Sequence, residues 1–123
     1  MNNRVFLTTH AIIFTGFALA LFFAPHIVWP LYGVELNDQY AYFLSQHNSI
    51  FLGGIGAITW LLKDIEEGKI AKKLFIALFI TNILGAVITL YAALTGVFVG
   101  FGWSDPAFFA LLSVLSYFQF AKQ

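Results

Sequence analysis

The stretch Tyr42–Leu62, YFLSQHNSIFLGGIGAITWLL, decides the fold of this chain. It is long and apolar enough to cross a membrane as one helix, because about 20 residues span the hydrocarbon layer. Near its start it carries five consecutive polar side chains, namely Ser45, Gln46, His47, Asn48 and Ser49. Polar groups are costly in lipid unless they are hydrogen-bonded. The stretch therefore predicts a membrane helix whose polar end has a specific role.

The composition of the whole chain agrees with a membrane protein. Its 123 residues are 60% hydrophobic and 10% charged, whereas soluble domains carry roughly 25% charged residues. The formal net charge is zero, so we expect no nucleic-acid partner. The sequence has no cysteine, which excludes disulfide scaffolds, zinc–thiolate sites and cysteine nucleophiles.

Four apolar runs predict four membrane spans, over residues 5–24, 41–62, 73–100 and 105–121. The first run stays apolar beyond Ala20 to Phe23, so we expect a span there and not a cleaved signal peptide. The predicted fold is all-α, an antiparallel four-helix transmembrane bundle that forms a single domain over residues 1–123.

The breaks between the runs carry helix-ending and helix-capping residues. Pro25 and Pro30 are expected to end the first helix and to hold PHIVWPLYG at the membrane interface. Asn37 or Asp38 can cap the second helix. Gly68 interrupts the charged turn KDIEEGK.

The positions of the charges predict the orientation. With four spans, every cationic residue falls on one side of the membrane: Arg4, Lys63, Lys69, Lys72, Lys73 and Lys122. The other side has Glu35, Asp38 and Asp105. Because cytoplasmic loops are enriched in lysine and arginine, both termini are expected in the cytoplasm.

Small residues recur at helical spacing and predict close helix packing. The residues that we expect to pack helices together are Gly53, Gly56, Asn82, Gly85 and Gly96. The predicted closest pair is the second and third helices, with the Asn82 side chain seated over Gly53.

The polar cluster does not fit one packing face. Successive helical residues point about 100° apart, so Gln46 and Ser49 can face the bundle while Asn48 points nearly the opposite way. The outer end of the bundle is then hydrated, or a ligand or another protein covers it. The candidate residues for contact with that ligand or partner are Gln46, His47, Asn48, Ser49 and Thr89.

The residues on which known four-span membrane proteins depend for activity are missing from this chain. Small multidrug exporters use a membrane-embedded glutamate, quinone-linked thiol oxidases and vitamin K epoxide reductases use cysteines, and glutathione-transferring enzymes use arginine-rich sites. Apart from Asp105 at the very start of the fourth run, no apolar run contains an acidic residue, and the only arginine is Arg4. We find no catalytic constellation and expect a protein that is not an enzyme.

Metal and cofactor sites are also not expected. His10, His26 and His47 fall at different depths of the predicted bundle, so two of them cannot ligate one haem within the chain. His47 could serve only as a single axial ligand to a haem or chlorin.

The segments WPLYGVEL, GGIGAITWLL and TNILGAVITL, followed by TG and GW, give the chain a layout that resembles small bacterial four-helix membrane proteins of unassigned activity. The resemblance implies a multi-pass protein of the bacterial inner membrane and transfers no site residues.

Two classes of function follow from these observations. The first is a non-catalytic membrane subunit, which acts as an accessory, assembly or stabilising component of a larger complex or as a homo-oligomer. The second is a binding or transport module for a lipid-like or other hydrophobic molecule. The expected partners are membrane lipids and either another membrane subunit or a second copy of the chain.

Overall fold

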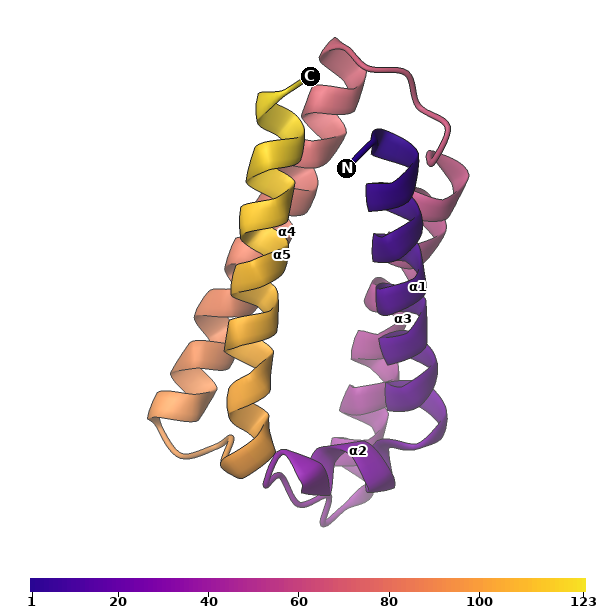
Figure 1. The fold of residues 1–123 in the computed structure, drawn as a ribbon. Helices are drawn as coiled ribbons and strands as arrows, with labels where there is room; N and C mark the ends of the chain where they lie inside the picture. The colour runs from indigo at the N-terminus through magenta and orange to yellow at the C-terminus, as the bar shows by residue number, and fades with distance from the viewer. The chain divides into compact units, whose positions relative to one another are not determined.

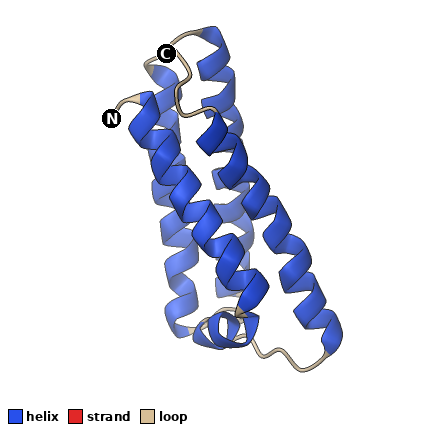
Figure 2. Ribbon diagram, turned by 90° about the vertical axis from the view of Figure 1, so that its right-hand side faces the viewer, coloured by secondary structure: helices blue, strands red, loops and turns tan.

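The structure, a computed structural model, describes all of residues 1–123 and is built entirely of helices. Figure 2 shows these helices, with loops only at their connections. The elements are α1 (Asn3–Phe23), α2 (Pro25–Leu31), α3 (Gln39–Leu61), α4 (Lys69–Leu94), the 3₁₀ helix η1 (Gly100–Trp103) and α5 (Ser104–Ala121). The predicted all-α class is therefore confirmed.

The chain divides into two compact units, Met1–Ile65 and Glu66–Gln123. The first contains α1, α2 and α3, and the second contains α4, η1 and α5. Figure 1 shows α1 beside α3 and α4 beside α5. Each unit is an antiparallel pair of long helices.

Small residues bring α1 and α3 together in the first unit. A Cβ atom built on Gly56 would lie 2.3 Å from Thr15 Oγ1 and 3.4 Å from the Ala11 carbonyl oxygen. A Cβ on Gly53 would lie 3.6 Å from the Ala18 Cβ, which is ordinary contact. Close backbone approach of this kind maximises dispersion contacts between helices. Gly56 is therefore the tightest point of this pair.

A buried hydrogen bond and an aromatic ring join α4 to α5 in the second unit. Asn82 Nδ2 donates to Ser116 Oγ at 3.2 Å, and Ser116 Oγ donates to the Leu112 carbonyl oxygen at 2.7 Å. A Cβ on Gly85 would come within 2.6 Å of the Phe109 ring. The missing side chain at position 85 thus makes room for the ring.

The structure gives Gly53 and Asn82 neighbours within their own units that the sequence did not predict. Gly53 lies against Ala18 of α1, and Asn82 bonds to Ser116 of α5. The physical reason is that α1 presents its own small residues to the glycines of α3, whereas α5 presents a hydroxyl to Asn82. Within the units, α1 packs with α3 and α4 packs with α5. The predicted approach of Asn82 to Gly53 joins different units and stays a prediction.

The third predicted span extends too far towards the C-terminus. It was expected to reach residue 100, whereas α4 ends at Leu94. Gly96 has φ +81°, a left-handed conformation that favours glycine and ends a helix. Its amide donates to the Ala93 carbonyl oxygen, and the Phe98 amide donates to that of Ala92. Gly96 is thus a helix-terminating residue and not a packing residue of α4.

Three of the predicted breaks are confirmed. The Asp38 side chain caps α3 by accepting from the Ala41 amide at 2.9 Å. Gly68, with φ +146°, lies immediately before α4. The first helix also ends before Pro25, as predicted, since α1 stops at Phe23. Residues Pro25–Leu31 then form the short helix α2, because Pro25 at its first turn is preset for a helical φ.

Two helices, α1 and α4, are long and apolar enough to cross a membrane by length and composition. Both carry exposed apolar side chains, for example Ile12 at 65% and Val87 at 62%. The remaining long helices, α3 and α5, have 23 and 18 residues.

Candidate functional site

Ser45 holds the end of α1 against the start of α3. Its Oγ donates to the Leu21 carbonyl oxygen at 2.9 Å and accepts from the Trp29 indole nitrogen Nε1 at 2.8 Å. The Ser45 residue is only 4% exposed. This one hydroxyl therefore connects α1, α2 and α3 at the same end of the first unit.

Pro25 explains why α1 needs donors from another helix. The last carbonyl groups of a helix have no partner within it, and proline has no N–H to donate. In a continuous helix the amide of residue 25 would bond to the Leu21 carbonyl; here Ser45 takes that place. Gln46 Nε2 likewise donates to the Phe22 carbonyl oxygen at 3.2 Å. Part of the polar cluster thus caps α1.

Ser49 completes the packed side of the cluster. It is buried, and its hydroxyl donates to the Gln46 carbonyl oxygen within α3. The structure therefore places Ser45, Gln46 and Ser49 on the side of α3 that faces α1. The capping role of Ser45 and Gln46 was not predicted from the sequence. Pro25, which has no N–H to donate, was the residue that indicated a need for such caps.

His47 and Asn48 are exposed on α3. The His47 ring stands between the rings of Phe43 and Phe51, with centroid separations of 5.6 Å to each. The Asn48 side chain has no hydrogen-bond partner within the first unit. Its helical neighbours Leu44 and Phe51 are 56% and 61% exposed. Asn48 is therefore a lone amide on an apolar surface.

Thr89, the fifth candidate contact residue, lies on α4. It belongs to the second unit, where its hydroxyl donates to the Gly85 carbonyl oxygen at 2.7 Å within α4. It is also buried, at 8% exposure. Its hydrogen-bonding capacity as a donor is used by its own helix.

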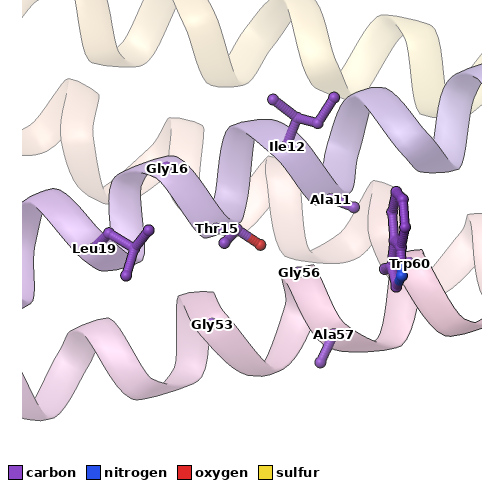
Figure 3. Close-up of a pocket in the computed structure, with 9 residues that line it drawn as sticks. All are labelled: Ala11, Ile12, Thr15, Gly16, Leu19, Gly53, Gly56, Ala57 and Trp60. Carbon is purple, nitrogen blue, oxygen red and sulfur yellow. The ribbon is translucent and has the colours of Figure 1, made fainter.

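An open apolar groove of about 640 Å³ runs between α1 and α3. Figure 3 shows Leu19 towards one end and Trp60 at the other, with Gly16 and Gly53 leaving space between them. The Thr15 hydroxyl points towards Gly56 across the two helices. The groove includes none of the five predicted contact residues, Gln46, His47, Asn48, Ser49 and Thr89.

No group of three or more histidine, cysteine, aspartate or glutamate side chains could hold a metal ion. Comparison with protein-family models, with curated proteins and with solved structures gives no match. The two surfaces that distinguish the chain are the exposed Asn48 side of α3 and the groove between α1 and α3.

Proposed function

We propose that this chain is a multi-pass membrane protein of the bacterial inner membrane, with α1, α3, α4 and α5 as its spans and both termini in the cytoplasm. The apolarity of α1 and α4 supports the membrane location. At 1.5 Å per residue, α3 is about 35 Å long and α5 about 27 Å, close to the roughly 30 Å of hydrocarbon. The one-sided distribution of lysine and arginine supports the orientation.

Within that membrane the chain acts as a non-catalytic subunit, and the Asn48 side of α3 is its contact surface for another membrane protein or a second copy. The observation that carries this function is the exposed Asn48 amide, which has no partner within the first unit. A polar group without a partner costs about 1–3 kcal/mol when buried in a protein, and more in hydrocarbon. A helix that covers this side of α3 removes that cost.

The neighbouring side chains fit such a contact. Phe43, Leu44 and Phe51 are each more than half exposed and surround His47 and Asn48 with apolar surface. Membrane helices associate by packing and by hydrogen bonds between polar side chains, each worth about 0.6 kcal/mol on average. One amide within an apolar side therefore fixes the position of a partner helix and adds modest affinity.

The substitution Asn48→Leu tests this function by native mass spectrometry of protein purified in mild detergent. We expect loss of a co-purifying membrane protein or of a multimer, while the monomer stays folded. The matched control is Asn48→Gln, which keeps the amide and should keep the partner. An Asn48→Leu variant that retains every partner and is merely more stable contradicts the proposal.

Binding of a lipid-like molecule is the second candidate function, and the groove between α1 and α3 favours it. The groove volume of about 640 Å³ is within the roughly 300–1,000 Å³ typical of small-molecule sites. Its position differs from that of the pocket expected around Gln46, His47, Asn48 and Thr89, so the two candidate functions use separate surfaces of α3.

A further inference from the structure

The groove between α1 and α3 is shaped for a long apolar molecule. Ile12 and Leu19 line it from α1 and are 65% and 54% exposed, so it opens sideways from the helix pair. Gly16 also lines it, and a Cβ atom built there meets nothing within 4 Å. The span from Ala11 to Leu19 extends about 12 Å along α1. The space is elongated, and its lining is almost wholly apolar.

One end of this groove carries a cation. Trp60 forms that end, and Lys63 Nζ lies 3.9 Å from the centre of the Trp60 ring. The same Nζ atom also donates to the Trp60 carbonyl oxygen at 3.5 Å, a weak contact. The Lys63 charge is thus held directly beside the groove.

The Lys63 charge has no acidic partner within the first unit. The neighbouring carboxylate, Asp64, forms an ion pair with Arg4 instead. Tryptophan and lysine are typical of the membrane–water interface, where an indole ring sits at headgroup level and an ammonium group reaches the polar layer. A positive charge beside an apolar groove matches a ligand with a negative headgroup and a hydrocarbon chain.

We infer that the groove binds one acyl chain of an anionic phospholipid, whose phosphate group contacts Lys63 beside Trp60. The inference rests on the membrane location in the proposed function and is independent of the partner at Asn48. A second copy of the chain is the other possible occupant by shape. A helix of that copy packed in the groove would not supply a negatively charged partner for Lys63. The uncompensated lysine therefore favours the phospholipid.

Gly16→Leu and Gly54→Leu form a matched pair for the test. Neither glycine has an atom within 4 Å of an added Cβ, but only Gly16 lines the groove. Each protein is reconstituted into phosphatidylcholine vesicles that contain phosphatidylglycerol, and retained lipids are counted by native mass spectrometry. We expect wild type and Gly54→Leu to retain one phosphatidylglycerol, and Gly16→Leu to lose it while its circular dichroism stays unchanged.

The charge is tested with Lys63→Gln and with Lys72→Gln as control. Lys63→Gln should lower the preference for phosphatidylglycerol over phosphatidylcholine about fivefold, the equivalent of roughly 1 kcal/mol for one lysine near an anionic surface. Lys72 is exposed on α4, in the second unit, and its substitution should leave the preference unchanged.

The outcomes that overturn the inference are distinct from failure of the proposed function. Equal lipid retention by Gly16→Leu and Gly54→Leu overturns it, as does a wild-type dimer that only Gly16→Leu dissociates. Asn48→Leu should retain the lipid even where it loses a protein partner. Loss of both lipid and partner in Asn48→Leu would mean that the two surfaces are one site, which contradicts the inference.

Discussion

Gly56 is the residue of the first unit at which an added side chain has the least room. A Cβ atom there would meet the Thr15 hydroxyl at 2.3 Å and the Thr15 backbone nitrogen at 3.2 Å. The hydroxyl can rotate away, but the backbone cannot move without separating the helices. The contact therefore makes α1–α3 packing sensitive to a single methyl group.

We predict that Gly56→Ala lowers the free energy of unfolding by about 1–3 kcal/mol, the usual range for overpacking. Gly53→Ala should have a smaller effect, because its Cβ would lie 3.6 Å from Ala18. Gly54→Ala is the control, since its Cβ would meet nothing within 4 Å. Thermal unfolding in detergent, followed by circular dichroism, measures all three. Equal stabilities for the Gly56 and Gly54 variants would refute this assignment.

Individual residues also show what the sequence could reveal about the site. Five polar side chains in an apolar run were recognisable as a special segment, and helical geometry separated Asn48 from Gln46 and Ser49. The sequence did not predict that Ser45 caps α1, because the capping depends on the start of α3 lying beside the end of α1. It also did not predict the open groove, because the groove is formed only when α1 and α3 lie side by side.

At the scale of the element, α4 and α5 fit together through a glycine and a ring. Phe109 occupies the space over Gly85, where a Cβ would come within 2.6 Å of its ring. The ring belongs to one residue and can be reduced in size. The contact can therefore be tested by enlarging position 85 and by reducing the ring at position 109.

We predict that Gly85→Ala destabilises the second unit by about 1–3 kcal/mol, and that adding Phe109→Leu restores part of that loss. Neighbouring substitutions of this kind couple by about 0.5–3 kcal/mol. A double-mutant cycle of unfolding free energies gives the coupling. Purely additive effects would show that the ring is not what limits position 85.

Helix ends were predicted less well than helix cores. The prediction of a charge-rich turn before α4 was correct, because Gly68 and its charged neighbours interrupt the apolar pattern. The end of α4 was missed because the residues beyond Leu94 are also apolar, so hydropathy alone gives no boundary there. Gly96 supplies the boundary through its left-handed backbone, which a spacing of small residues does not reveal.

For the whole molecule, the placement of charge predicts the orientation in the membrane. A fluorescent reporter that is active only in the cytoplasm should give signal when it is fused after Gln123. The same reporter inserted after Glu35, in the loop between α2 and α3, should be dark. A periplasmic alkaline phosphatase reporter should give the reverse pattern at both positions. Signal from the Glu35 insertion and darkness at Gln123 would invert the proposed topology.

The all-helical class followed from composition and four apolar runs, because those properties depend on local sequence alone. The division into two units did not, since it depends on which surfaces match: Gly56 with Thr15 in one unit, and Asn82 with Ser116 in the other. Small-residue stripes identify surfaces that can approach closely, but they do not specify the partner of each stripe.

The division after Ile65 has a consequence for biosynthesis. The contacts that close α1 on α3, including Ser45 with Leu21 and Arg4 with Asp64, all lie within the part of the chain that the ribosome makes first. Proteins generally acquire structure from the N-terminus during synthesis, at about 5–20 residues per second. The first hairpin can therefore assemble before α5 has been translated, and the Leu21 carbonyl gains its donor without waiting for the rest of the nascent chain.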